Sequence, residues 1–308
     1  MLLEPILMLP AYRYGRETPW GGEKLRHYGK YAPATKVGES YEFSAIPGLE
    51  SCAPDGRSLS ALIQQYGEAL LGEQSYLTAP LVIRLVDAED RQSVHVHLSE
   101  NCANTGWYVI KAEKANRVTL GTAESFDATK LLSAIENSEV ADDFFCDIPV
   151  QAGDTFVIPY GVPHSVGSGI LLYEIQAAHC ETYRLYDWNR VDHRGYKRAV
   201  QAEKAIRAMR NTAVHSSCTN EEQKYENPSC EQLLSTDDYC LLKLTNCENT
   251  PFRAASTYAV LTCLDQALIT LRSGKTMYLS AGQTVLIPAQ VCDFTLTGKE
   301  FLLAKPQI

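Results

Sequence analysis

The chain has 308 residues, 45% of them hydrophobic, and a formal net charge of −9. This length can bury a sizeable core, either in two domains or in one elaborated domain. An acidic chain repels phosphate backbones and anionic lipids, so we expect no nucleic acid and no membrane as partner. An anionic small molecule stays open as a ligand, because a local arginine can override the mean charge.

The ten cysteines contain no C-x2-C pair. Scattered cysteines without metal-binding spacing predict reduced thiols, and therefore a cytoplasmic protein. The N-terminal stretch MLLEPILMLP is apolar but short, has no basic residue, and is interrupted by Pro5 and Pro10. It therefore predicts neither a signal peptide nor a membrane span.

Apolar spacing predicts a first helix over 58–72, with Ser58 or Ser60 placed to cap it. Strands then dominate, with two further helices at 127–137 and 195–210, the last strongly basic. The expected strands in this part are 81–88, 93–98, 106–112, 154–159 and 170–177. Short strands at such spacing favour an antiparallel sandwich or barrel.

A polar stretch over 211–235 predicts a linker, and strand signals return over 238–308. This last part repeats a piece of the first: GDTFVIPYGVPH (153–164) aligns without a gap with GQTVLIPAQVCD (282–293). Asp293 stands where the first copy has His164. If the two parts are duplicates, only the first retains the histidine.

His95 and His97 form an H-x-H pattern on a predicted strand. Strand side chains alternate, so both imidazoles lie on one face and supply half of a metal site. Taken alone, the pattern is equally consistent with an exposed or hydrogen-bonded histidine pair.

The spacing Gly-x5-Pro-x-Gly-x2-His, ending at His164, matches the second sequence motif of the cupin superfamily. The chain therefore resembles a cupin. This implies a mostly β fold: a jelly-roll β-barrel with helical insertions, and a second, smaller cupin-like β domain. The expected boundaries are 1–190 for the metal-binding cupin domain, 191–235 for a helix and polar linker, and 236–308 for a degenerate cupin-like domain.

A more specific resemblance is to the type I mannose-6-phosphate isomerases (phosphomannose isomerases). Three stretches carry it: TPWGGEKL (18–25), APLVIRLVDAEDRQSVHVH (79–97) and YEIQAAHCETYRLYDWNRVDHRGYKR (173–198). It implies an isomerase of carbohydrate metabolism that interconverts mannose 6-phosphate and fructose 6-phosphate through an enediol. It also implies one zinc ion per chain and a phosphosugar substrate.

The resemblance assigns site residues. His95 stands at a glutamine ligand of the family, and His97 and His164 at its two histidine ligands. Arg184 is the family arginine that faces the substrate, and Glu174 is a carboxylate of the same pocket. Glu174 or a hydroxide on the metal would serve as base. On strands leading to the site, Arg84 and Ser93 are candidate phosphate contacts.

The chain also departs from the family. Thr105 stands at a glutamate ligand and Ala103 at a lysine. Glu100, three residues after His97, is a candidate substitute carboxylate ligand. These departures leave two alternatives open: a sugar-binding cupin with reduced or altered activity, and an isomerase of a different sugar, such as an unphosphorylated one. No exposed apolar face predicts an interface, so we expect a monomer or a weak homodimer.

Overall fold

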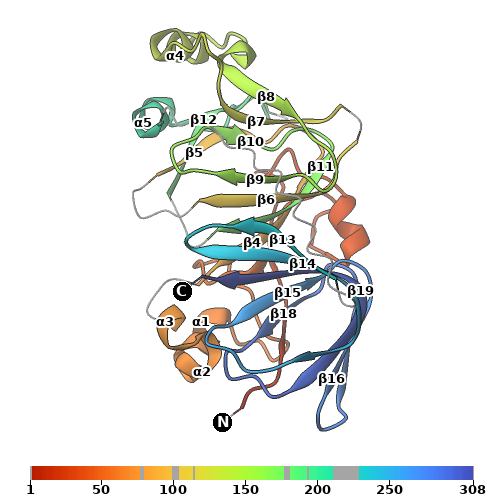
Figure 1. Ribbon diagram of the computed structural model, residues 1–308. Helices are drawn as coiled ribbons and strands as arrows, with labels where there is room; N and C mark the ends of the chain where they lie inside the picture. Colours follow the sequence, from red (N-terminus) through yellow and green to blue (C-terminus); the bar gives the residue numbers. More distant parts are fainter. Residues whose placement is uncertain are drawn as a thin grey trace.

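The computed structural model describes residues 2–76, 80–98, 104–113, 115–176, 181–192, 194–210 and 229–307. It confirms the mostly β fold. Three antiparallel sheets follow one another along the long axis of the molecule (Figure 1). None of the helices in the described part of the chain is long and apolar enough to cross a lipid bilayer.

The first two sheets form the part of the fold that carries the H-x-H strand. One has five strands in the order β12 (Glu181–Tyr186), β5 (Val94–Leu98), β10 (His164–Ser165), β7 (Arg117–Thr122) and β8 (Phe145–Pro149). The other has six, in the order β2 (Ala11–Tyr14), β3 (Val37–Phe43), β4 (Val82–Ala88), β11 (Ile170–Gln176), β6 (Thr105–Lys111) and β9 (Thr155–Ile158).

The six-stranded sheet is covered on both faces. Val86, Trp107 and Val109 pack toward the five-stranded sheet, in the same cluster as Leu120. Residues of the opposite face, such as Ile83, belong to a cluster that reaches the C-terminal part of the chain. Every residue of β3, β4 and β11 is buried. Burial on both faces explains why these strands are nearly continuous apolar runs in the sequence.

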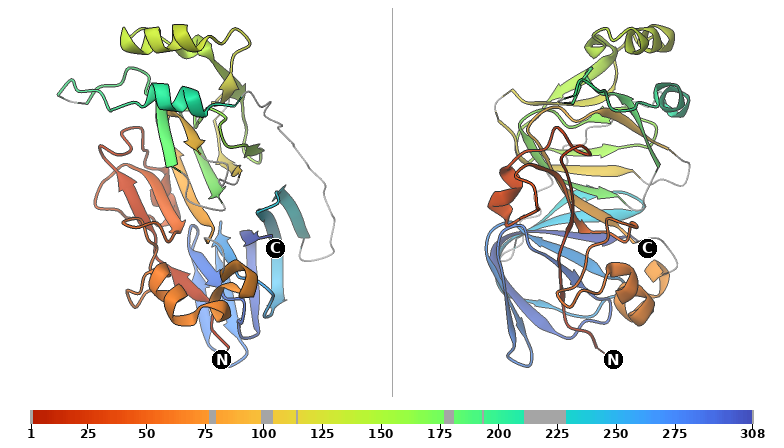
Figure 2. Two further views of the ribbon diagram at one scale, coloured as in Figure 1. Left: turned by 90° about the vertical axis from the view of Figure 1, so that its left-hand side faces the viewer. Right: turned by 180° about the vertical axis from the view of Figure 1, so that it is seen from behind.

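The third sheet is C-terminal and has its own core. Its main order is β1 (Ile6–Met8), β18 (Thr284–Ile287), β15 (Ala259–Cys263), β19 (Phe294–Pro306), β14 (Tyr239–Phe252) and β13 (Ser229–Ser235), and β16 (Ala267–Leu271) joins β17 (Thr276–Leu279) to β19. Two of these strands lie outside the expected 236–308. The N-terminal segment supplies β1, which pairs with β18, so the N-terminus lies beside this sheet (Figure 2). The expected linker supplies β13.

The structure retains the repeat found in the sequence. Gly153 and Gly282 both have positive φ, at 97° and 84°, and both precede a strand of four residues. Their backbone N–H groups donate to Val109 O at 2.8 Å and to Cys263 O at 2.7 Å. The following strands pair antiparallel with β6 and β15 respectively. The two segments therefore share a turn and a strand arrangement.

The helices are shorter than the sequence predicts. The first expected helix is divided into α1 (Leu59–Tyr66) and α2 (Glu68–Leu71) at Gly67, whose φ is 47°, and α3 (Glu73–Tyr76) follows. Ser58 caps α1, its Oγ accepting from Ala61 N at 3.2 Å. The remaining helices are α4 (Ala128–Glu136), the 3-10 turns η1 (Lys24–Tyr28) and η2 (Asp142–Phe144), and α5 (Ala202–Ala208).

The third expected helix, 195–210, is helical only in α5. The residues before it bond to β12 instead of forming helical turns. Gln201 N donates to Arg184 O at 2.7 Å, and Arg184 N donates to the Gln201 side chain at 3.0 Å. Arg198 is held by Asp187, which also lies just after β12. Tertiary hydrogen bonds thus override the helical pattern of the sequence.

Candidate metal centre and the pocket beside it

The three histidines singled out in the sequence come together in the five-stranded sheet. His95 and His97 project from β5, and His164 on β10 is the direct neighbour of His95 in the strand register. Their candidate ligand atoms all lie within 4.8 Å of one another, and all three side chains are buried. Convergence of three imidazoles at this spacing is what a divalent metal ion requires.

Hydrogen bonds fix which ring nitrogen of two histidines is free. Nδ1 of His95 lies 3.0 Å from Ser93 O, and Nδ1 of His164 lies 2.8 Å from Val162 O. A carbonyl only accepts, so both Nδ1 atoms carry the proton and both Nε2 atoms keep a lone pair. Nε2 of His164 is buried, and none of the described residues offers it a hydrogen-bond partner. A metal ion would satisfy this atom.

His97 has polar neighbours at both ring nitrogens. Its Nδ1 lies 3.0 Å from Thr182 Oγ1 on β12, and its Nε2 lies 3.2 Å from Gln176 Nε2 on β11. An amide nitrogen can only donate, so Nε2 of His97 accepts and also keeps its lone pair. All three imidazoles therefore present Nε2, with Nδ1 oriented by a neighbour, as metal-binding histidines do.

Burial keeps two of these imidazoles neutral. Loss of hydration lowers the pKa of His95 to about 4, although the Ser93 carbonyl opposes this shift. Burial, together with repulsion from His95, lowers the pKa of His164 to about 3. The neutral imidazole is the form that binds metal. The residues present therefore fit a divalent ion such as zinc, with a coordination position left open.

Glu174 lies on the facing sheet, bound on both carboxylate oxygens. Oε1 accepts from Arg84 Nε at 2.6 Å, and Oε2 accepts from Trp107 Nε1 at 2.8 Å. Arg84 also donates from Nη1 to Glu39 Oε1 at 2.9 Å and to Tyr41 Oη at 3.3 Å. Glu174 is 1% exposed and Arg84 8%. Both carboxylate oxygens are thus hydrogen-bonded in a buried position.

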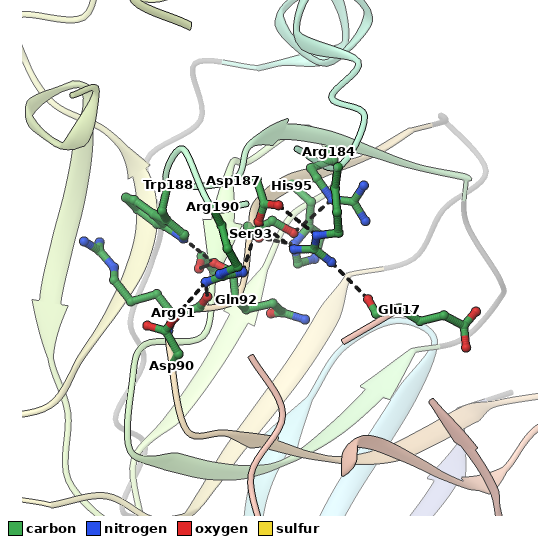
Figure 3. Close-up of polar contacts among 12 residues, drawn as sticks. Glu17, Asp90, Arg91, Gln92, Ser93, His95, Arg184, Asp187, Trp188 and Arg190 are labelled. Carbon is green, nitrogen blue, oxygen red and sulfur yellow. Dashed lines mark hydrogen bonds and ion pairs between the residues drawn. The ribbon is translucent and has the colours of Figure 1, made fainter. Parts of the chain in front are cut away.

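A cavity of about 410 Å³ opens beside His95. Its walls are rich in arginine: Arg13, Arg84, Arg184 and Arg198 all line it. Arg184 is the direct strand neighbour of His95 and donates from Nε to Ser93 Oγ at 3.3 Å (Figure 3). Burial and the nearby Arg198 lower the pKa of Arg184. Three glutamates, Glu17, Glu39 and Glu181, line the same cavity, so its walls carry charges of both signs.

Asp187, from the YDW part of the third family-like stretch, organises two of the surrounding arginines. Arg198 donates to it from Nε at 2.8 Å and from Nη2 at 2.5 Å, and Arg190 donates from Nη1 at 3.1 Å. Arg198 also donates to the backbone carbonyl of Glu17 at 3.0 Å. Arg198, held by Asp187, thus ties the segment after β12 to the N-terminal loop at the pocket.

Thr105, which the family resemblance aligns with a glutamate, is buried on β6. The Gln176 side chain links its hydroxyl to His97 of the histidine cluster. The Gln176 amide donates to Thr105 Oγ1 at 3.3 Å as well as to His97. Ala103 and Glu100, the lysine position and the substitute ligand, lie outside the described residues. Four groups at the site are not predicted from the sequence: Arg13, Glu39, Arg198 and the Gln176 amide. For Arg13 and Glu39 no local pattern signals a role, because only the β2–β3–β4 pairing brings them to the pocket.

Antiparallel sheets that carry three buried histidines beside a polar cavity give a cupin-like fold with a candidate metal site. No family model matches the chain. It is 26% identical to mannose-6-phosphate isomerase ManA of Bacillus subtilis over 313 residues, which cover 97% of each protein. It is 34% identical to the mannose-6-phosphate isomerase of Streptococcus mutans over 202 residues, or 61% of this chain and 63% of the relative.

The chain is also similar to a solved structure. The mannose 6-phosphate isomerase of Bacillus subtilis superposes with a TM-score of 0.82 at 23% identity, covering 98% of this chain and 99% of that one. The chain is therefore a protein like the type I mannose-6-phosphate isomerases, built on a cupin fold.

Proposed function

We propose that the protein is a zinc-dependent aldose–ketose isomerase that interconverts mannose 6-phosphate and fructose 6-phosphate through an enediol. One observation carries the proposal: three buried imidazoles, each presenting Nε2, lie beside an arginine-lined cavity. They do so in a chain similar to a mannose-6-phosphate isomerase along almost its whole length. The seven cysteines in the described part are all free thiols, which supports the cytoplasmic location that we propose for it.

One zinc ion per chain would be held by His95, His97 and His164, with Glu100 as a further ligand. Bound there, zinc would polarise the sugar carbonyl and stabilise the negative charge that develops on the sugar oxygens. The protein's part is to orient the imidazoles, which the Ser93 and Val162 carbonyls do for His95 and His164, while burial keeps these two rings neutral.

The other side chains act on the sugar itself. Arg184 lies one strand from His95, where its guanidinium would stabilise developing negative charge. Ser93 accepts from Arg184, so its own hydroxyl proton is available to the substrate. Glu174 is the base in this proposal. It would accept the proton at Oε2, whose partner is the neutral Trp107 indole, while Oε1 stays hydrogen-bonded to Arg84.

Thr105 favours a second candidate, a sugar-binding cupin with reduced or altered activity. Its hydroxyl is engaged by Gln176 where the family resemblance implies a metal-binding glutamate. Such a protein would bind metal and sugar but turn over slowly. An isomerase of another sugar is the remaining alternative. Comparing the binding of a phosphorylated and an unphosphorylated sugar alcohol, as described for Arg13, tests it.

The test combines metal analysis of the purified chain with a coupled assay in which fructose 6-phosphate formation is followed. We expect about one zinc per chain and turnover that a chelator abolishes and added zinc restores. Full metal content without turnover would reject the isomerase in favour of the sugar-binding protein. Absence of bound metal after zinc loading would reject the three-histidine site.

A further inference from the structure

A phosphorylated sugar needs cations for its phosphate, and most arginines of the pocket are already committed. Arg84 donates to the carboxylates of both Glu174 and Glu39. Arg198 makes two bonds to Asp187. In the described part of the chain, neither Arg184 nor Arg13 has a carboxylate within normal hydrogen-bond distance. Arg184 donates instead to the Ser93 hydroxyl and to the Ala199 carbonyl. This leaves Arg13 as the candidate cation for the phosphate.

Arg13 is held in place but incompletely paired. It lies on the edge strand β2 directly opposite Glu39 on β3, so both side chains share the face of the sheet that carries Arg84. Its Nη1 is 3.5 Å from Glu39 Oε2, too long for a good hydrogen bond. Its guanidinium lies 5.6 Å from the ring centre of Tyr41. Its Nε is buried, and the described residues provide no partner for it.

An unpaired buried N–H of a charged group is costly, so a ligand anion at this position would be stabilised. The Glu39 carboxylate is not available to Arg13 alone, because its Oε1 accepts a hydrogen bond from Arg84. Glu39 is thus shared between two guanidinium groups, and the buried Nε of Arg13 keeps no partner among the described residues. Arg13 also lies near enough to Arg184 to contribute to its lowered pKa. A guanidinium with an unpaired N–H matches a phosphate oxygen well.

We propose that Arg13 binds the phosphate of the substrate and makes the pocket specific for phosphorylated sugars. The inference deepens the proposed function and rests on it. Arg13 would supply the cation that is missing at Ala103. Arg84, our candidate from the sequence, would instead position Glu174.

The first test is steady-state kinetics of the zinc-loaded chain with Arg13→Gln, Arg13→Lys and a control, Arg16→Gln. Arg16 is on the same loop, but its side chain is 75% exposed, pairs with Asp192, and does not line this cavity. We expect Arg13→Gln to raise KM for mannose 6-phosphate at least 10-fold with kcat within 3-fold. Arg13→Lys should recover most of the affinity, and Arg16→Gln should change neither constant. An unchanged KM in Arg13→Gln would overturn the inference.

The second test separates this inference from the isomerase proposal. Calorimetry measures binding of glucitol 6-phosphate, which cannot isomerise, and of unphosphorylated glucitol. Arg13→Gln should weaken the phosphorylated compound at least 10-fold and leave glucitol unchanged. If this weakening is observed in a chain that shows no turnover, the phosphate site is supported and the isomerase proposal is rejected. Equal binding of glucitol 6-phosphate to both proteins, with normal turnover, would reject the phosphate site alone. A wild-type chain that binds no glucitol 6-phosphate would overturn the inference.

Discussion

Arg84 donates from Nε to Oε1 of Glu174 at 2.6 Å, between side chains that face each other on adjacent strands β4 and β11. Both residues are almost completely buried. Removing Glu174 leaves the buried Arg84 charge with Glu39 as its one carboxylate partner among the described residues. The pair therefore stabilises the six-stranded sheet and also holds the proposed base in place.

The first prediction concerns this pair. Glu174→Gln should lower the free energy of unfolding by about 3–5 kcal/mol, because Arg84 keeps only Glu39. The double variant Glu174→Gln/Arg84→Met should recover part of that loss. Urea unfolding measures both. Additive effects of the two substitutions would show that the charges do not interact.

The second prediction concerns metal content. His164→Ala should reduce bound zinc from about one per chain to nearly none, because three imidazoles are the least that holds the ion firmly. His27→Ala, an exposed histidine in η1, is the matched control and should keep its zinc. Atomic absorption after dialysis gives the answer. Retention of zinc by folded His164→Ala would remove His164 from the site.

The third prediction uses Gln176, whose amide nitrogen lies 3.2 Å from Nε2 of His97. Gln176→Glu is nearly isosteric and places a carboxylate oxygen beside the three imidazoles. Since a carboxylate is a stronger zinc ligand than an amide, zinc affinity should rise by at least about 10-fold. Competition with a fluorescent chelator measures this, with Gln74→Glu on the exposed side of α3 as control. An unchanged affinity would show that residue 176 points away from the ion.

The fourth prediction is a pH dependence of the metal-free protein. The pKa values of His95 and His164 are about 4 and about 3 in the folded chain, against about 6.5 when unfolded. Below pH 6.5 the unfolded state binds more protons, so the free energy of unfolding should fall as pH drops toward 4 and be unaffected by these groups above 6.5. Each histidine contributes at most about 1.4 kcal/mol per pH unit.

Urea titrations at several pH values measure this slope, and His164→Ala provides its control. The variant lacks one of the two depressed groups, so its slope between pH 4 and 6 should be about half that of the wild type. An identical slope in the two proteins would assign the pH dependence to other groups.

The fifth prediction compares the two turn glycines of the repeat. Both have positive φ, so alanine is strained at either position, by about 1 kcal/mol. A Cβ at Gly153 would meet nothing within 4 Å, whereas at Gly282 it would lie 2.2 Å from the Tyr28 carbonyl oxygen. Gly282→Ala should therefore be clearly less stable than Gly153→Ala in thermal unfolding. Equal losses would show that η1 can move away from the turn.

The sequence by itself determined the elements whose signals are local. Strand alternation put His95 and His97 on one face, and the glycine–proline spacing before His164 fixed a turn that recurs before β18. The family-like stretches also indicated Arg184 and the three imidazoles. The shared face and the turn could be predicted because period-two patterns and turn residues depend on neighbours in the chain. The roles of Arg184 and the three imidazoles stay predictions.

Tertiary structure decided what depends on distant partners. It placed β1 in the C-terminal sheet and shortened the 195–210 helix to α5, because hydrogen bonds to β12 outweigh helix propensity. It also committed Arg84 to two carboxylates and left Arg13 incompletely paired. Whether an arginine side chain has unpaired N–H groups depends on the carboxylates that neighbouring strands bring to it. The spacing of residues within one strand does not show this.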